Sequence, residues 1–315
     1  MNEIVKKIRE NKSFEIITHE RPDGDAAASE SALALLLRYL GKDVKIIDID
    51  DFPEIYKFLI KNWKNAELKK ADCTFFLDCG EKNRITEHYK KKIIGNCIIN
   101  IDHHTDNSGY GDYNLVLPEY SSTAEILYYL FRRFNIKEGQ INKNFFKSIY
   151  TGISTDTGNL SFSNADSRTF RTVSDLMNVL GNPRDIYKKI YCSKKANKVK
   201  LTGEVLRRIE TFFDNKLVIS YVKKNDFDNY NLSHSELEGI VDYLGEIKNA
   251  EVYILVKQLG ENISRLSLRS TGNISVLDFA KNNSGGGHSF AAGATINNNL
   301  NETKKIIKDY WSRKL

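Results

Sequence analysis

Three continuous apolar segments of this chain each end in aspartate or histidine, and this pattern limits the fold more than any other feature. Residues 14–17 lead into His19, residues 73–77 into Asp78, and residues 97–101 into Asp102-His103-His104. The segments have the length of buried strands, and helical patterns lie between them. Apolar strands that alternate with helices are typical of a parallel sheet covered on both faces. We therefore predict an α/β fold.

The carboxyl ends of parallel strands lie at one edge of a sheet, and ligands bind at that edge. A helix predicted over residues 145–153 runs into Ser154-Thr155-Asp156-Thr157-Gly158-Asn159, which we expect to be a polar loop. The groups that could meet there are acidic or imidazole side chains: His19, Asp23, Asp25, Asp78, His103 and Asp156, with Asp102 and His104 beside them.

The first of these positions is a turn, Thr18-His19-Glu20-Arg21-Pro22-Asp23-Gly24-Asp25-Ala26. Leucines at helical spacing follow it, at positions 33, 36, 37 and 40, so the turn joins a strand to a helix. Pro22 and Gly24 favour a tight turn. Such a turn cannot bury two unpaired carboxylates cheaply. Either a cation compensates Asp23 and Asp25 or the turn is solvated, and this stretch alone leaves both readings open.

Taken together, six mixed nitrogen and oxygen ligands exceed what one catalytic zinc ion uses. They suit two divalent ions roughly 3.5–4 Å apart that share a carboxylate. Carboxylate with imidazole favours Mn²⁺, while iron, cobalt and magnesium are alternatives. A two-metal site activates water and binds both oxygens of an in-line phosphoryl displacement, so the reaction we expect is phosphoester hydrolysis.

A second organisation begins near Leu201, with strands predicted over residues 217–222, 251–257 and 263–269. Ser235 and Glu238 have capping-box spacing before a helical apolar pattern that reaches Leu244. The segment Ser284-Gly285-Gly286-Gly287-His288 follows, and consecutive glycines let backbone N–H groups approach an anion. We expect a domain over residues 1–185, a basic linker over 186–202 and a smaller α/β domain over 203–315.

The net charge of +6 is concentrated in one segment rather than spread as on a general nucleic-acid coat. Residues 181–200 hold seven basic residues against Asp185 alone: Arg184, Lys188, Lys189, Lys194, Lys195, Lys198 and Lys200. This segment is either a solvated helical linker or a basic wall beside a phosphate-binding cleft.

The chain has no apolar stretch long enough for a membrane span and no secretory signal at its start, so we expect a cytoplasmic protein. It has four cysteines, and none of them shows CxxC spacing. We expect buried thiols rather than disulfides or a zinc site.

In their order along the chain, five motifs resemble the DHH–DHHA1 phosphoesterases. They are His19-x3-Asp23-Gly24-Asp25, Asp78, Asp102-His103-His104, Thr155-Asp156-Thr157-Gly158 and Gly285-Gly286-Gly287-His288. The resemblance covers nearly the whole chain and is strongest to short cytoplasmic nanoRNases that also dephosphorylate adenosine 3′,5′-bisphosphate (pAp). It implies a DHH catalytic domain, a DHHA1 substrate-binding domain and a cleft between them.

The resemblance also implies roles. His19, Asp23 and Asp78 would bind one metal, and Asp25, Asp78, His103 and Asp156 the other; Asp78 and Asp156 would bridge. Asp102 would orient the neighbouring ligand, and His104 would contact phosphate. Arg269 and the loop of Gly285, Gly286, Gly287 and His288 would hold the other end of the substrate. The implied activity is hydrolysis of short oligoribonucleotides to mononucleotides and of pAp to AMP, through hydroxide activated by two divalent ions, most typically Mn²⁺.

Two positions depart from the family pattern, since Ser284 and Ala28 stand where glycine is common. Hydrolysis of pApA or cyclic di-AMP is an alternative activity, and a non-catalytic nucleotide-binding protein is an alternative of another class. The sequence leaves open whether the protein is a homodimer.

Overall fold

A computed structural model describes residues 1–20, 22–49, 52–237 and 239–315 of the chain. The chain divides into two compact units, Met1–Ser193 and Lys194–Leu315. The division falls within residues 186–202, where we expect a linker, and most of that segment is helical. Its helical parts belong to α7 (Arg184–Tyr191) and α8 (Ala196–Arg207).

The first unit is built on a parallel five-stranded sheet, as the apolar segments predict. Its strand order is β2-β1-β3-β4-β5. The strands are β1 (Ser13–Ile17), β2 (Asp43–Ile46), β3 (Cys73–Leu77), β4 (Ile98–Asp102) and β5 (Tyr113–Val116). Because β1, β3 and β4 are adjacent and parallel, the residues that follow them share one edge.

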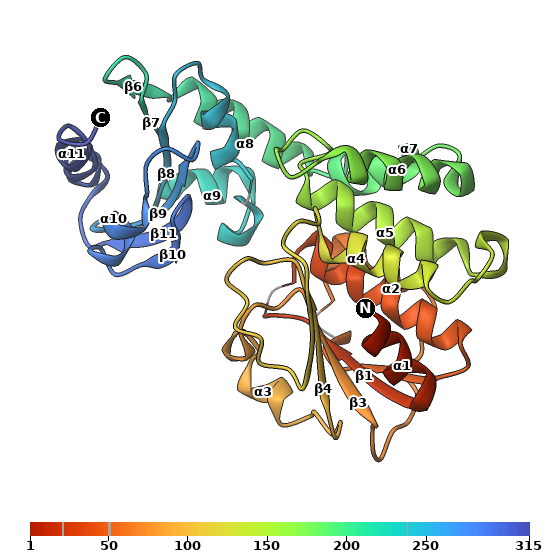
Figure 1. Ribbon diagram of the computed structural model, residues 1–315. Coiled ribbons are helices and arrows are strands. Elements are labelled where there is room, and N and C mark those ends of the chain that lie inside the picture. The colour runs from red at the N-terminus through yellow and green to blue at the C-terminus, as the bar shows by residue number, and fades with distance from the viewer. Residues whose placement is uncertain (21, 50–51, 238) are drawn as a thin grey trace. The chain divides into compact units, whose positions relative to one another are not determined.

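Helices cover both faces of this sheet (Figure 1). The helical elements of the unit, besides α7, are α1 (Asn2–Glu10), α2 (Gly24–Tyr39), η2 (Glu54–Tyr56), η3 (Lys82–Arg84), α3 (Glu87–Lys90), α4 (Thr123–Arg132), η4 (Glu138–Gln140), α5 (Lys143–Asp156) and α6 (Ser167–Leu180). On one face, Phe75 and Leu77 pack into the core made by α2, α4 and α5. On the other, Phe76 packs with Ile85 and Tyr89 beside α3.

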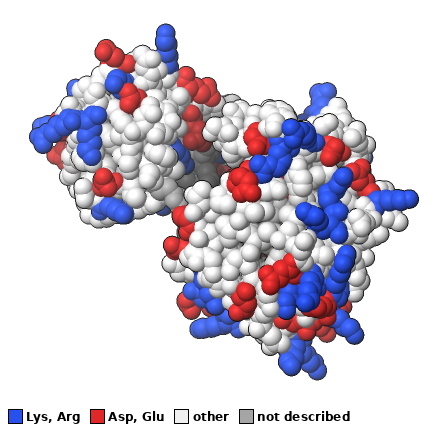
Figure 2. All heavy atoms as spheres, in the orientation of Figure 1, with Lys and Arg blue, Asp and Glu red and all other residues white. Residues whose placement is uncertain are grey.

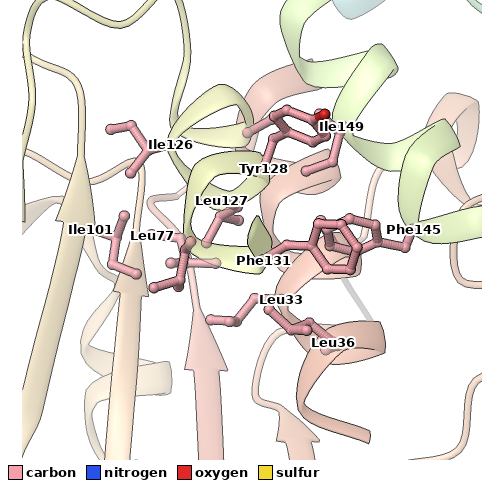
Figure 3. Packing of buried hydrophobic residues seen from close by; sticks show 14 of the residues in the cluster. Leu33, Leu36, Leu77, Ile101, Ile126, Leu127, Tyr128, Phe131, Phe145 and Ile149 are labelled. Carbon is pink, nitrogen blue, oxygen red and sulfur yellow. The ribbon is translucent and has the colours of Figure 1, made fainter. Parts of the chain in front are cut away.

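The main core is dominated by aliphatic and aromatic side chains from α2, α4 and α5 (Figure 3). The ring of Phe131 lies 4.9 Å from that of Phe145 and 5.7 Å from that of Phe146, measured between centroids. Leu33 and Leu36 of α2 and Ile149 of α5 fill the space around these rings. This packing fixes the three helices that carry or support the acidic residues.

The second unit is smaller and has a mixed six-stranded sheet of order β10-β11-β9-β8-β7-β6. Its strands are β6 (Glu210–Phe212), β7 (Leu217–Val222), β8 (Val252–Gly260), β9 (Ile263–Ser270), β10 (Gly286–His288) and β11 (Ala291–Ile296). Its other helical elements are α9 (Lys224–Tyr230), η5 (His234–Leu237), η6 (Val241–Glu246), α10 (Leu277–Lys281) and α11 (Leu300–Trp311). The predicted strand 217–222 is confirmed at both ends, and the predicted strands 251–257 and 263–269 are confirmed within three residues.

The helix predicted over the apolar pattern that reaches Leu244 is wrong in type, because η5 and η6 form there instead of an α-helix. Backbone N–H groups bond to the third residue back, as that of Ile240 does to the carbonyl oxygen of Leu237. The side chain of Ser235 and all of Glu238 lie outside the described residues, so the proposed capping box there is not described.

The expected polar loop around Asp156 is also corrected, because α5 continues through Ser154 and Thr155 and ends at Asp156 itself. The glycine segment is not a free loop either. Gly286 and Gly287 lie in β10, an edge strand that pairs with β11. The local sequence of both segments is polar or rich in glycine and did not indicate regular structure. The end of α5 depends on tertiary packing, and β10 depends on pairing with β11.

The expectation of four thiols is wrong for one pair, since Cys73 and Cys97 form a disulfide. They face each other at the start of the adjacent strands β3 and β4, with Cα atoms 4.6 Å apart. That separation lies within the range that disulfides span. Cys79 and Cys192 are free. Cys79 is buried as expected, whereas Cys192 is exposed, so the expectation of a buried thiol is wrong there.

Basic and acidic side chains are mixed on the face of the first unit that Figure 2 shows. In the basic segment, Lys189 lies over the ring of Phe58, and Lys195 pairs with Glu236 at 2.8 Å. These contacts favour the reading of this segment as a surface helix. In the described part of the chain, no helix has the length and apolarity needed to cross a membrane.

Candidate metal centre

The predicted acidic and imidazole groups of the first unit converge at the carboxyl edge of its sheet. Three sets of side chains have ligand atoms within 4.8 Å of one another. They are His19, Asp23 and Asp78; Asp25, His103 and Asp156; and Asp78, His103 and His104. Asp78 and His103 each belong to two sets, so the three sets form one continuous cluster.

Asp78 lies at the centre of this cluster. Its Oδ2 is 3.9 Å from Nε2 of His19, and its Oδ1 is 3.6 Å from Nε2 of His103. Asp78 follows β3 directly and has a left-handed backbone with φ of 52°. That conformation costs a non-glycine residue of order 1–3 kcal/mol and is concentrated at functional sites. The hydroxyl of Thr123 donates to Oδ1 of Asp78 at 3.0 Å.

Asp25 is buried against the beginning of α4. Its Oδ2 accepts from the backbone N–H of Thr123 at 2.7 Å, and its Oδ1 from that of Ala124 at 3.0 Å. The first N–H groups of a helix have no partners within the helix and attract negative charge. Asp23, in contrast, is exposed and caps α2 by accepting from the N–H groups of Asp25 and Ala26.

Close packing between α2 and α5 brings Asp156 to these groups. A Cβ atom on Gly24 would lie 2.4 Å from the side chain of Thr155, and one on Gly152 would lie 2.5 Å from Oδ1 of Asp25. Only glycine permits either approach. As a result Oδ2 of Asp156 lies 3.5 Å from Nε2 of His103. The glycine between the two turn aspartates therefore acts through packing.

The three inner carboxylates repel one another in a buried place. Burial, with the charges of Asp156 and Asp23, raises the pKa of Asp25 well above its usual range. Burial and the charges of Asp25 and Asp23 do the same to the pKa of Asp78. Burial and then Asp23 raise the pKa of Asp156 to about 7. All three pKa values are raised because the buried carboxylates lie near one another without enough positive charge on the described residues to balance them.

Burial lowers the pKa of His19 and of His103, so both imidazoles are neutral at neutral pH. Neutral imidazole is the form that binds a metal ion. The other ring nitrogen of His19, Nδ1, lies 2.9 Å from the carbonyl oxygen of Glu20, which orients the ring. Three carboxylates that need a cation and two neutral imidazoles make a donor set that fits divalent metal ions.

Asp102 and His104 form a hydrogen-bonded pair, in which Asp102 is buried and 34% of the side chain of His104 is exposed. Oδ1 of Asp102 lies 2.7 Å from Nδ1 of His104 and also accepts from the backbone N–H groups of His103 and His104. The hydrogen bond with Asp102 raises the pKa of His104 to about 9, so His104 carries a proton at neutral pH. Burial would raise the pKa of Asp102, but bonds from His104 and Asn107 outweigh it and lower that pKa.

Three residues that sequence reasoning missed support the site. Thr123 donates its backbone N–H to Asp25 and its hydroxyl to Asp78. Asn107 donates to Asp102, and the positive charge of Arg84 opposes protonation of His19 and His104. No local pattern marks Asn107 or Arg84, because their roles depend on loop positions that only the fold sets.

In the second unit, strand register brings Arg269 beside the glycine segment. Ala291 of β11 pairs with Arg269 on one side and with His288 on the other. Nε of Arg269 lies 3.5 Å from a carboxylate oxygen of Asp242. The side chain of His288 lies outside the described part of the structure.

The glycines of this segment are not equivalent. A Cβ atom on Gly285 would lie 2.0 Å from the carbonyl oxygen of Gly293, and Gly287 has φ of 137°, so packing and backbone explain both. Gly286 has nothing within 4 Å of such an atom. Ser284 has φ of 50°, a conformation that favours glycine, which accounts physically for the glycine common in the family.

Metal binding at this cluster should depend steeply on pH. Below the raised pKa values of Asp25, Asp78 and Asp156 these groups are protonated, and below the lowered pKa values of His19 and His103 the imidazoles are charged. A bound cation displaces all these protons, so its stabilising effect must grow as the pH rises through about 7.

We predict that Mn²⁺ raises the melting temperature little at pH 5 and clearly at pH 8, each relative to EDTA. At a hundredfold excess over Kd the expected stabilisation is about 2.7 kcal/mol. Thermal unfolding in the two buffers checks this. An equal rise at both pH values would contradict the assignment of these carboxylates as ligands.

The comparison with known proteins agrees with this architecture. Residues 13–153 match the model of the DHH family, N-terminal domain, and residues 214–313 match that of the DHHA1 domain. The chain is 25% identical over 307 residues to the bifunctional oligoribonuclease and PAP phosphatase NrnA of Bacillus subtilis, covering 98% of this chain and 96% of that protein. It is 26% identical to the NrnA of Thermus thermophilus, covering 89% and 83%.

A solved structure has the same fold. The exopolyphosphatase-related protein of Bacteroides fragilis superposes with a TM-score of 0.88 at 24% identity, covering 99% of this chain and 95% of that one. The two family models lie on the two units in the order that the motifs indicate. The chain therefore belongs to the DHH–DHHA1 family of phosphoester hydrolases.

Proposed function

We propose that this protein hydrolyses short oligoribonucleotides to mononucleotides and removes the 3′-phosphate of pAp to give AMP. The observation that carries the proposal is the continuous cluster centred on Asp78, whose donor types fit two divalent ions. The relatives from Bacillus subtilis and Thermus thermophilus, matched over most of their length, carry names that state both activities.

We propose His19, Asp23 and Asp78 as ligands of one ion and Asp25, His103 and Asp156 as ligands of the other, with Asp78 shared. The ligand atoms within each of these two sets lie within 4.8 Å of one another, which supports this division. Mixed carboxylate and imidazole donors favour Mn²⁺. Bound divalent ions would supply Lewis acidity towards the phosphoryl group and a nucleophile from water near neutral pH.

Besides metal ligands, we propose that the chain contributes a proton donor, the imidazolium of His104. Asp102 holds Nδ1 of His104, which leaves Nε2–H of the protonated ring free to donate to a phosphoryl oxygen. His104 is also among the more accessible members of the cluster, with 34% of its side chain exposed. We therefore propose His104 as the phosphate-contacting residue and Asp102 as its positioning residue.

For the second unit we propose substrate binding by Arg269 and the segment from Gly285 to His288. The register that aligns Arg269 and His288 across β11 supports a single subsite. The guanidinium can bind phosphate bidentately, and the space over Gly286 allows close approach to the backbone. RNA and nucleotide turnover takes place inside the cell, so we propose cytoplasmic action.

The direct test is a product time course with Mn²⁺ on pAp, pApA, cyclic di-AMP, RNA of two to five nucleotides and long single-stranded DNA. We expect turnover of pAp and short RNA. Asp78→Asn should lower kcat by about 100-fold or more, since even residues that only support a metal ligand cost 10–100-fold.

Asp185→Asn is the matched control, because it removes an exposed carboxylate on α7. Asp78→Asn removes a charge that the fold disfavours, so its thermal stability without metal should not fall. Full activity of Asp78→Asn would refute the metal assignment, and preference for pApA or cyclic di-AMP would replace the proposed substrates.

Gly286→Ala tests the second unit separately. A methyl group fits there without a clash, so the melting temperature should hold. If substrate approaches this backbone, KM for short RNA should rise about tenfold, roughly 1.4 kcal/mol, with kcat little changed. Gly203→Ala, also in open space, is the control. Unchanged KM in Gly286→Ala would remove this segment from the substrate site.

A further inference from the structure

An exposed aromatic side chain lies on the loop that follows the cluster residue Asp156 and has no assigned role. Phe162 is 59% exposed, the largest fraction among the large apolar residues in the described part of the chain. Its ring lies against Gly158, where a Cβ atom would be 2.5 Å from it. Gly158 follows the cluster residue Asp156 by two positions.

The loop that carries Phe162 is strained and firmly held. Gly158, Asn159 and Leu160 have consecutive left-handed φ angles of 54°, 57° and 68°. Such backbone persists only where surrounding bonds over-determine it, and it is concentrated at functional sites. Here the hydroxyl of Thr157 accepts from the N–H of Leu160 at 2.9 Å, and its carbonyl oxygen accepts from the N–H of Phe162 at 3.0 Å.

The same loop is tied to the cluster itself. The side-chain amide of Asn164 donates to the carbonyl oxygens of Asp156 and Ser121, both at 3.1 Å. Leu160 packs inward against the main core, while Phe162 stays in solvent. Backbone strain and several hydrogen bonds therefore accompany a loop whose Phe162 ring is exposed to solvent.

The cluster is open to solvent at Asp23, His104 and Asp156, and the last of these begins the segment that leads to Phe162. Asp25 and Asp78 are 1% exposed and His19 is 5% exposed, whereas 26% of the side chain of Asp156 is exposed. A phosphate ester at the Asp156 side of the cluster would lie beside the loop that carries Phe162. Single-stranded nucleic acids bind by stacking bases on exposed aromatic rings.

From this geometry we infer that Phe162 is a stacking platform for the nucleobase of the nucleotide whose phosphate lies at the metal cluster. The inference rests on the proposed function and deepens it, because it makes the base itself a recognition element. A flat ring accepts any base, so we expect selectivity for a base over none rather than for one base.

The test is equilibrium binding by calorimetry with Mn²⁺, comparing AMP with ribose 5-phosphate, which lacks the base. Wild type should bind AMP more tightly by on the order of 5- to 100-fold. Phe162→Ala and Phe162→Leu should remove that preference without weakening ribose 5-phosphate, and Phe162→Trp should keep it. Phe170→Ala is the matched control, since Phe170 is 52% exposed on α6.

Binding is measured without turnover, so the two proposals fail separately. A wild type that hydrolyses neither pAp nor RNA yet shows the AMP preference would overturn the proposed function and leave the stacking role standing. No preference in wild type, or an unchanged preference in Phe162→Ala, would overturn the stacking role. Equal weakening of both ligands would also overturn it, because it would indicate a structural role.

Discussion

The first unit depends on holding several carboxylates together against their mutual repulsion. Asp25 and Asp78 are almost fully buried, and the charge of Asp25 raises the pKa of Asp78 further. The fold offsets part of this cost with backbone N–H groups at the beginning of α4 and with the hydroxyl of Thr123. The rest of this cost remains because the described part of the chain places too little positive charge beside the carboxylates to balance them. Bound divalent ions would supply that charge.

Small residues make this convergence possible. Gly24 contacts Thr155, and Gly152 contacts Ala124 and Asp25, so α2, α4 and α5 approach closely at the edge of the sheet. Each of these contacts lies one residue from an acidic group or directly on one. The geometry of the site therefore depends on the packing of the core. The aromatic cluster around Phe131 stabilises that packing.

The sequence predicts the parallel sheet and its cluster because both follow from local chemistry. A continuous apolar segment predicts a buried strand, and the polar residues that follow it, such as Asp78 or Asp102-His103-His104, mark where that strand ends. Features that depend on distant partners were missed: Thr123 and Arg84 act through contacts that only the fold creates. The disulfide of Cys73 and Cys97 depends on strand register, and the helical end of α5 at Asp156 on packing against Gly24. The apolar pattern before Leu244 shows that spacing alone does not separate an α-helix from 3₁₀ turns.

The proposal that the cluster binds two metal ions sharing Asp78 is best tested by diffraction from crystals grown with Mn²⁺ and recorded at the manganese absorption edge. We expect two anomalous peaks per chain, roughly 3.5–4 Å apart, with an oxygen of Asp78 in contact with both. A single peak, or two peaks that do not share Asp78, would contradict it.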